Sequence, residues 1–177
     1  GYLGEQIRMY FGDGSKYGID IAYSSEDHPL GTAGALKKAE NLLNDVFFTL
    51  YGDSYLFLDF SNIMSYFRSH DKSALMTVYR NHDQYDKSNT VINSGLVTKY
   101  SKQEKTADML YIDYGVNVFR KEILRMIPDS EFYPLEDLFI KLIAGHQILA
   151  FEVKQRFYEI GSPDGLREFE QYAKEIR

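Results

Sequence analysis

The chain has 177 residues, of which 44% are hydrophobic and 26% are charged, and its formal net charge is −6. These proportions are typical of one globular domain, and the acidic balance argues against binding of nucleic acid through a broad basic surface. The sequence has no cysteine, which excludes disulfides and thiolate metal sites, and its apolar stretches are too short for a membrane span. We expect a single cytoplasmic domain over residues 1–177, with no nucleic-acid or membrane partner, and self-association into a homo-oligomer stays open.

The first half of the sequence alternates between helix-like and strand-like patterns. A helix begins almost at the first residue, an alternating strand follows, and a loop leads into a second helix. The next strand is nearly continuous in apolar residues, as in strands buried on both faces of a parallel sheet. This rhythm predicts an α/β fold with a doubly wound, mixed and mostly parallel sheet. The expected elements are helices over 1–8, 34–43 and 61–70, and strands over 17–23, 46–51 and 74–79.

The second half has a more antiparallel character. Asn93-Ser94-Gly95 supplies turn chemistry between two short runs, which predicts a hairpin over 91–97. A long strand follows, then a helix that stops at Pro128 and another that ends at Gly145. Two short strands precede a last helix, which begins after Pro163. The expected elements are strands over 109–119, 148–153 and 156–160, and a helix over 135–144.

The loop Pro29-Leu30-Gly31-Thr32-Ala33-Gly34-Ala35 connects the first predicted strand to the second predicted helix. Two glycines and a threonine before a helix N-terminus present free backbone N–H groups without bulky side chains. Such a loop suits the close approach of a flat or anionic ligand. The alternative interpretation is a sharp strand-to-helix turn without a ligand.

Two carboxylates follow predicted strands. Gly52 and Asp53 come directly after the most apolar strand, and Glu159 lies near the end of a later one. In open α/β sheets, ligands bind beyond the carboxyl ends of strands, where a carboxylate can hold Mg²⁺ against phosphate oxygens. Asp53 and Glu159 would form such a pair if their strand ends are adjacent. The alternatives are that Asp53 caps the next loop or helix and that Ser162-Pro163 only begins a helix.

Five segments occur in an order that resembles the sugar-1-phosphate nucleotidyltransferases, or nucleotide-diphospho-sugar pyrophosphorylases. The resemblance covers nearly the whole chain and is closest to the heptose- and mannose-1-phosphate guanylyltransferase-like members. It implies a Rossmann-like nucleotide-diphospho-sugar transferase fold with a smaller antiparallel sugar-binding part. The segments are Gly1-Tyr2-Leu3-Gly4, the 29–35 loop, Tyr51-Gly52-Asp53, Tyr111-Ile112-Asp113-Tyr114-Gly115 and Glu159-Ile160-Gly161-Ser162-Pro163.

The resemblance implies transfer of a nucleotidyl group from a nucleoside triphosphate to a sugar 1-phosphate, with Mg²⁺ as cofactor and pyrophosphate as the second product. This reaction belongs to nucleotide-sugar biosynthesis for surface polysaccharides. Asp53 matches the metal-binding aspartate of the family, and Glu159 matches the second metal position, where Asp or Asn is usual. The implied nucleotide-binding residues are Leu30, Gly31, Thr32, Ala33, Gly34 and Gly52, and the implied sugar-binding residues are Lys102, Asp113 and Gly115.

The sequence departs from the family pattern in ways that bear on substrate and activity. Ser101 replaces a glutamate before Lys102, and Asp113 stands where asparagine is common, so the sugar stays open, as does the nucleobase. The family's glycine-rich loop, whose Arg and Lys hold the triphosphate, is expected upstream of Gly1. We therefore expect an N-terminally truncated chain that lacks the first strand, holds no catalytic residue of its own and is inactive by itself.

Two other functions stay open at this point. A regulatory relative would bind sugar nucleotides without catalysis, which the missing loop, Ser101 and Glu159 favour. A glycosyltransferase can share a nucleotide-binding α/β half and a metal-binding aspartate after a strand. Its usual Asp-x-Asp pattern is absent, because Asp53-Ser54-Tyr55 lacks the second carboxylate.

Overall fold

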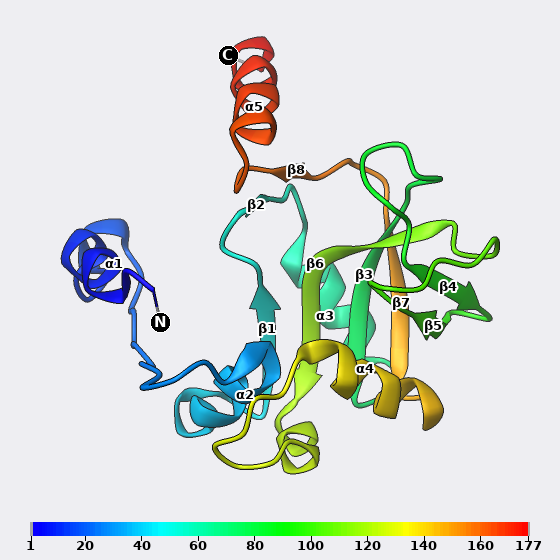
Figure 1. Ribbon diagram of the computed structural model, residues 1–177, viewed down its shortest axis with the longest axis horizontal. Helices are drawn as coiled ribbons and strands as arrows, with labels where there is room; N and C mark the ends of the chain where they lie inside the picture. Colours follow the sequence, from blue (N-terminus) through cyan, green and yellow to red (C-terminus); the bar gives the residue numbers. More distant parts are fainter. Residues whose placement is uncertain (1, 177) are drawn as a thin grey trace. The chain divides into compact units, whose positions relative to one another are not determined.

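The computed structural model describes residues 2–176, which form two compact units. The first unit takes in the chain up to Asp45 together with Lys121–Leu138. The second takes in Val46–Arg120 and the chain from Phe139 onward. All strands formed by the described residues belong to the second unit (Figure 1). Within the described part of the chain, no helix combines the length and apolar character that a membrane crossing requires.

The second unit is built on a six-stranded sheet with the strand order β1-β6-β3-β7-β5-β4. The strand β3 lies between β6 and β7, and its first five residues are buried. At one edge, β1 pairs with β6 alone among the described strands, and of its residues only Phe47 is buried, less than its apolar sequence predicts. The strands are β1 (Val46–Leu50), β3 (Ala74–Arg80), β4 (Thr90–Asn93), β5 (Leu96–Tyr100), β6 (Tyr111–Arg120) and β7 (Ile148–Val153).

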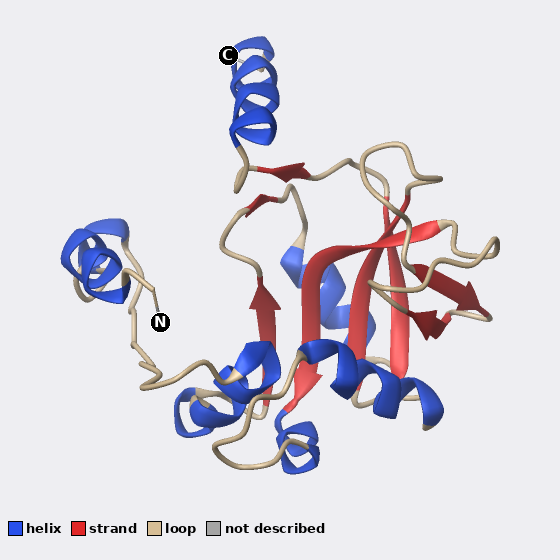
Figure 2. Ribbon diagram, in the orientation of Figure 1, coloured by secondary structure: helices blue, strands red, loops and turns tan. Residues whose placement is uncertain are grey.

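The α/β class and the mixed sheet are confirmed, but the prediction of mostly parallel pairing is wrong for the described strands. Among them only the pairing of β3 with β7 is parallel. The helix α3 (Phe60–Arg68) connects β1 to β3, and these two strands point the same way because both run antiparallel to β6. The predicted βαβ unit is therefore present, with β6 inserted between its strands (Figure 2).

Elements whose ends carry their own chemical signals follow the predictions closely. Ser94 and Gly95 join β4 to β5 with φ angles of 51° and 77°, the left-handed pair that a tight hairpin turn requires. The helix α3 begins after Asp59, whose carboxylate accepts the backbone N–H of Asn62 at 3.0 Å. The helix α4 (Leu135–Ala144) has the predicted bounds.

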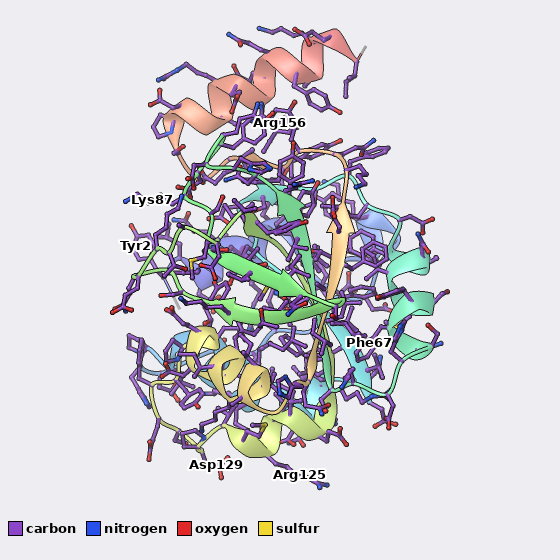
Figure 3. The ribbon with its side chains drawn as sticks, turned by 90° about the vertical axis from the view of Figure 1, so that its right-hand side faces the viewer. Tyr2, Phe67, Lys87, Arg125, Asp129 and Arg156 are labelled. Atoms are coloured by element: carbon purple, nitrogen blue, oxygen red, sulfur yellow. The ribbon has the colours of Figure 1, made fainter. Side chains whose placement is uncertain are left out.

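Helices cover both faces of the sheet in the second unit. On one face, Ile63 and Phe67 of α3 pack in a cluster with side chains of β3, β6 and β7, and Figure 3 shows Phe67 beside the sheet. On the other face, Phe139 of α4 stacks on Phe119 of β6 at a ring-centroid distance of 6.2 Å. Full burial of such a side chain contributes about 1.5–3 kcal/mol. These two layers fix the sheet that carries the site described below.

A short ribbon and a helix end the chain. The strands β2 (Ser54–Tyr55) and β8 (Tyr158–Glu159) pair antiparallel, and β8 covers part of the strand predicted over 156–160. The helix α5 (Pro163–Glu175) begins as predicted, and the hydroxyl of Ser162 accepts the N–H of Gly165 at 3.1 Å. Tyr172 of α5 stacks on Tyr158 of β8, with ring centroids 4.5 Å apart.

The first unit contains helices and loops but no strand among its described residues, so the strand predicted over 17–23 is wrong. Tyr17 ends a single turn of 3-10 helix, and Gly14 and Gly18 on either side of this turn have positive φ angles. An alternating pattern gives a strand only where another strand pairs with it, and residues 19–26 have no such partner in the described chain. The helix predicted before Pro128 is a 3-10 helix. The helices are α1 (Gly4–Phe11), η1 (Ser15–Tyr17), α2 (Gly31–Lys38), η2 (Glu40–Leu42) and η3 (Lys121–Met126).

Candidate active site

A cavity of about 820 Å³ lies in the second unit, a volume within the range of roughly 300–1,000 Å³ that is usual for small-molecule sites. Its lining comes from the turn after β1, the loops that follow β3 and β5, the start of β6, and β8. The cavity brings together all the residues that the sequence predicts for metal and sugar binding. These residues are Asp53, Lys102, Asp113, Gly115 and Glu159.

The strand β6 carries a bulge beside this cavity. Compared with β3, it has extra residues opposite Thr77, whose hydroxyl donates to the carbonyl of Val116 at 2.7 Å. Gly115, within the bulge, has a φ of +94°, and a Cβ at this position would lie 3.3 Å from the Tyr51 ring. Bulges of this kind re-aim side chains at the end of a sheet. Here the bulge follows Asp113 directly and places this residue on the cavity wall.

Asp113 is held by one hydrogen bond to its carboxyl and one from its backbone. Its Oδ1 accepts the N–H of Gly115 at 3.0 Å, and the N–H of Asp113 itself donates to Oδ1 of Asn89 at 3.0 Å. Asp113 is half-buried and lines the cavity. Burial raises the pKa of Asp113 from 3.8 to about 6, against the opposing effects of the Gly115 N–H and the Lys102 charge. Asp113 is therefore mostly ionised at neutral pH.

Tyr51 and Lys102 form a further part of the wall. The Lys102 ammonium lies 5.4 Å from the centre of the Tyr51 ring, within the range of about 6 Å for a cation–π contact. Burial raises the pKa of Tyr51, and the negative charges of Asp113 and Asp53 raise it further, so the phenol stays protonated at neutral pH. The wall thus offers one positive charge beside a neutral aromatic ring.

The β2–β8 ribbon brings the two predicted metal carboxylates together, which confirms that the chain segments carrying them are adjacent. The N–H of Ile160 donates to the carbonyl of Asp53 at 2.7 Å. Both side chains converge on Gly161, where a Cβ would lie 2.5 Å from Oε1 of Glu159 and 3.0 Å from Oδ2 of Asp53. Gly52, in the exposed turn just before, has room for a Cβ with no atom within 4 Å.

This carboxylate pair supplies part of a coordination shell for Mg²⁺. Within residues 2–176, no cluster of three or more His, Asp or Glu side chains is arranged to hold a metal ion. Glu159 already accepts the N–H of Gly161 at 2.6 Å and the hydroxyl of Ser162 at 3.0 Å. Asp53 is exposed, and its carboxylate accepts no hydrogen bond within the described chain. Mg²⁺ usually takes one or two carboxylates and completes its shell with phosphate oxygens and water, so the pair fits an ion that binds with a phosphorylated ligand.

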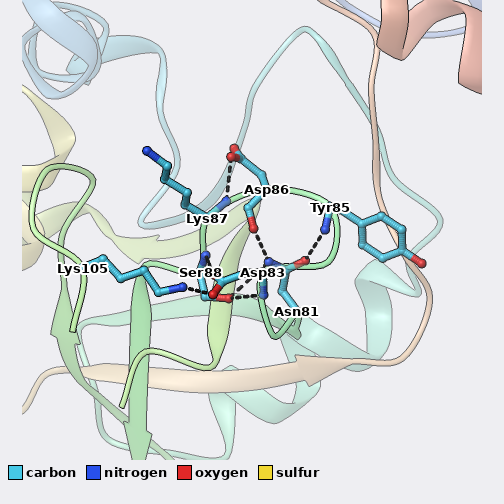
Figure 4. A network of polar contacts seen from close by, with 7 residues as sticks. All are labelled: Asn81, Asp83, Tyr85, Asp86, Lys87, Ser88 and Lys105. Atoms are coloured by element: carbon cyan, nitrogen blue, oxygen red, sulfur yellow. Dashed lines mark hydrogen bonds and ion pairs between the residues drawn. The ribbon is translucent and has the colours of Figure 1, made fainter. Parts of the chain in front are cut away.

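The loop between β3 and β4 lines the cavity, and no sequence motif indicates it. Figure 4 shows the polar network within this loop. The side chain of buried Asn81 donates to the carbonyl of Asp86 at 2.6 Å. The hydroxyl of buried Ser88 accepts the N–H of Asp83 at 3.0 Å, and the Asp83 carboxylate accepts the N–H of Ser88 at 2.7 Å and pairs with Lys105. These bonds hold the loop in place without a ligand. One sequence signal could have indicated this loop: its polar residues directly follow a buried strand, as Asp53 does.

The predicted base-binding segment, Leu30–Gly34, belongs to the first unit and covers the start of α2. The expectation of free N–H groups is wrong for Ala33 and Gly34, because both donate to the Tyr133 carbonyl at 3.0 Å. At either glycine of the segment, a Cβ would lie 2.8 Å from a backbone oxygen in residues 131–133. Close backbone packing therefore explains these glycines. Thr32 is the exposed member of the segment.

Comparison with known proteins places this geometry in context. A family model described as nucleotidyl transferase matches residues 2–175. The UTP–glucose-1-phosphate uridylyltransferase of Synechocystis is 29% identical over an alignment of 185 residues. The alignment covers 92% of this chain and 47% of that protein. The D-glycero-alpha-D-manno-heptose 1-phosphate guanylyltransferase of Aneurinibacillus thermoaerophilus is 29% identical over 169 residues, which cover 94% of this chain and 73% of that protein. The chain thus spans less than half the length of the first of these relatives.

Solved structures share the fold. The inositol-1-phosphate CTP transferase from T. maritima matches with a TM-score of 0.73 at 22% sequence identity, covering 97% of this chain and 71% of that chain. At this level of identity the match shows the fold alone. The α/β architecture predicted from the sequence is thereby confirmed by an independent structure.

Proposed function

The chain belongs to the nucleotidyl transferase family, and on this premise we propose that the protein transfers a nucleotidyl group from a nucleoside triphosphate to a sugar 1-phosphate. The products are a nucleotide sugar and pyrophosphate. The observation that carries this proposal is the meeting of Asp53 and Glu159 at a cavity that also contains Lys102 and Asp113. The names of the two curated relatives, which describe nucleotidyl transfer to glucose 1-phosphate and to a heptose 1-phosphate, support it.

We place Mg²⁺ at Asp53, with Glu159 as the second carboxylate. When bound, the ion would offset the negative charge of the phosphates during transfer. Asp53 suits direct contact because its carboxylate is exposed and accepts no hydrogen bond within the described chain. Glu159 already accepts bonds from Gly161 and Ser162, which suits contact through water.

The sugar 1-phosphate occupies the cavity in this proposal. Lys102 supplies a positive charge for its phosphate, while Asp113 accepts hydrogen bonds from ring hydroxyls. Gly115 leaves room beside the Tyr51 ring. A phosphate oxygen attacks the α-phosphorus of the triphosphate, and the bond from that phosphorus to the pyrophosphate oxygen breaks. No side chain has to act as a general base, because a sugar phosphate is already an anionic nucleophile, and the protein contributes positioning and charge stabilisation.

Nucleotide contacts are proposed for each of the two units separately. The base binds at Leu30–Gly34, where Thr32 is exposed while Ala33 and Gly34 are buried. The triphosphate passes Gly52, whose exposed turn offers backbone without a side chain next to Asp53. The compartment in this proposal is the cytoplasm, where nucleoside triphosphates are available.

One observation favours a second candidate, a relative that binds sugar nucleotides without catalysis. Both carboxylate oxygens of Glu159 already accept hydrogen bonds, so this residue is partly withdrawn from metal binding. Such a protein would use the same cavity and the same sugar contacts but would release no pyrophosphate.

Product formation by the protein at its natural length separates these candidates. The protein is incubated with Mg²⁺, each common nucleoside triphosphate, and glucose, mannose or heptose 1-phosphate, and the products are identified by mass spectrometry. We expect at least one pair to give a nucleotide sugar and pyrophosphate only when Mg²⁺ is present. Tight binding of a nucleotide sugar by calorimetry without product would favour the non-catalytic relative, and absence of both would overturn both candidates.

A further inference from the structure

Asn89 lies just before β4 and lines the cavity beside Asp113. Its backbone is fully used, because its N–H donates to the carbonyl of Tyr111 at 2.9 Å and its carbonyl accepts the N–H of Ser101 at 3.0 Å. These two bonds fix the main chain of Asn89 between β6 and the loop after β5. The direction of its side chain is then decided by the polar groups around its amide.

The orientation of the Asn89 amide is determined by its partners. Its Oδ1 accepts the backbone N–H of Asp113 at 3.0 Å and the hydroxyl of Thr90 at 2.8 Å. A backbone N–H can only donate, so a flipped amide would set Nδ2 against the N–H of Asp113, donor against donor. The amide oxygen of Asn89 therefore faces its two protein donors, Asp113 and Thr90. The amide nitrogen, Nδ2, is not used by these bonds.

Two complementary polar atoms result at the cavity wall. Nδ2 of Asn89 carries two N–H donors, and neither makes a hydrogen bond within the described residues. Oδ1 of Asp113 accepts the N–H of Gly115, while Oδ2 accepts no hydrogen bond in the same part of the chain. A donor and an acceptor, both held by backbone bonds, thus stand on adjacent residues in space without protein partners.

We propose that Asn89 is a specificity-determining residue of the sugar site, with Nδ2 donating to one sugar hydroxyl while Oδ2 of Asp113 accepts from the neighbouring hydroxyl. The inference rests on the proposed function. It assigns the substrate class as sugar 1-phosphates with two adjacent free ring hydroxyls at this wall, and it excludes sugars that are deoxygenated there. A site built to bond a hydroxyl rejects the analogue lacking it by a large factor, about 10⁴ in favourable cases, because its own polar groups are left unpaired.

Asn89→Asp is the test variant. The aspartate keeps the shape of the side chain and an oxygen that accepts from Asp113 and Thr90, but it replaces the Nδ2 donors with an acceptor. The matched control is Asn93→Asp, in the exposed hairpin turn outside the cavity, where Oδ1 likewise accepts a neighbouring hydroxyl, that of Ser94 at 3.1 Å. Both variants change the net charge equally.

Calorimetry on the protein at its natural length measures binding of mannose 1-phosphate, glucose 1-phosphate and their monodeoxy analogues, and of the nucleoside triphosphate alone. We expect Asn89→Asp to weaken binding of the preferred sugar phosphate by at least about tenfold, since one hydrogen bond is lost. Triphosphate binding should not change, and Asn93→Asp should match the wild type. The wild type should reject one monodeoxy analogue, and Asn89→Asp should bind that analogue and the parent sugar equally.

Asp113→Asn probes the other half of the pair if Asn89→Asp fails to fold. The Oδ1 of this asparagine still accepts the Gly115 N–H, while the Nδ2 amide, a donor, replaces the acceptor Oδ2, so discrimination against the adjacent deoxy position should be lost. Unchanged sugar binding and unchanged deoxy discrimination in either folded variant would overturn the inference and leave the proposed function intact. Equal weakening of sugar and triphosphate binding would indicate a structural role and also overturn it. Failure of the wild type to bind any of these sugar phosphates would overturn the proposed function and the inference together.

Discussion

The backbone N–H of Asp113 donates to Oδ1 of Asn89, 24 positions earlier in the chain, at 3.0 Å. This bond ties the loop after β3 to the start of β6, and the N–H of Gly115 holds the same aspartate from its carboxyl side. The sugar end of the cavity is therefore assembled by hydrogen bonds within one unit before any ligand binds. Changes to these few contacts should affect stability and sugar binding together.

Replacement of Gly115 by alanine should destabilise the second unit. Its φ of +94° is strained for an L side chain by about 1–3 kcal/mol, and the added Cβ would lie 3.3 Å from the Tyr51 ring. We expect the free energy of unfolding in urea to fall by about that amount. Gly52→Ala is the control, because a Cβ there meets no atom within 4 Å and the change should stay within about 1 kcal/mol. Equal losses in the two variants would contradict this explanation.

The raised pKa of Asp113 predicts a pH dependence of stability. Folding raises this pKa from 3.8 to about 6, so between these values the folded state binds the proton more tightly than the unfolded state does. The stabilising contribution of protonated Asp113 is complete below the unfolded pKa and is lost as the pH rises through the folded pKa. The asparagine in Asp113→Asn does not titrate and keeps an acceptor for the Gly115 N–H. As the pH rises through this window, the stability of this variant relative to the wild type should therefore increase. Urea unfolding of the wild type and of Asp113→Asn at about pH 4 and about pH 7 measures this change. Between the two pH values, the difference in free energy of unfolding should change by about 1.4 kcal/mol for each unit of pKa shift. If the free energies of unfolding of the two proteins differ by the same amount at both pH values, the pKa of Asp113 is not shifted by folding.

Ser88→Ala should loosen the loop between β3 and β4. The buried hydroxyl accepts the N–H of Asp83 at 3.0 Å and the side-chain amide of Asn81 at 3.2 Å. Its removal leaves two donors without this acceptor, which costs about 1–3 kcal/mol in the free energy of unfolding. Ser61→Ala is the control, since Ser61 is exposed in the first turn of α3 and alanine favours helix. Unfolding curves that coincide for wild type and Ser88→Ala would refute the assigned role.

Local signals in the sequence were sufficient for elements whose ends have their own chemistry. The turn at Asn93-Ser94-Gly95, the end of α4 at Gly145 and the start of α5 at Pro163 are found as predicted. Strand pairing was not predictable in the same way, because the insertion of β6 between β1 and β3 depends on contacts between distant segments. The alternation over 17–23 misled for a related reason, since a strand requires a partner that this pattern does not specify.

The candidate site was predictable where residues match a family motif. Asp53 and Glu159 were indicated by their position after predicted strands and by the resemblance, Lys102 and Asp113 by the resemblance alone, and the cavity brings all four together. Asn89 was not predictable, because its role follows from the direction of one amide group and the partners of its oxygen. The expectation of free N–H groups in the 29–35 loop was wrong because it also depended on a distant contact. The segment 131–133, which accepts two of these N–H groups, lies about a hundred residues away in the chain.

The turnover of Asp53→Ala, measured as pyrophosphate release by the protein at its natural length, tests the central claim most directly. Asp53 is exposed and its carboxylate accepts no hydrogen bond within the described chain, so the free energy of unfolding should not change. Asp71→Ala, at an exposed position outside the cavity, is the matched control and should keep full turnover. We predict that kcat of Asp53→Ala falls by at least about 100-fold, as expected for loss of a group that stabilises charge in the transition state. Turnover close to that of the wild type would contradict the assignment of Asp53 to the metal and with it the proposed site.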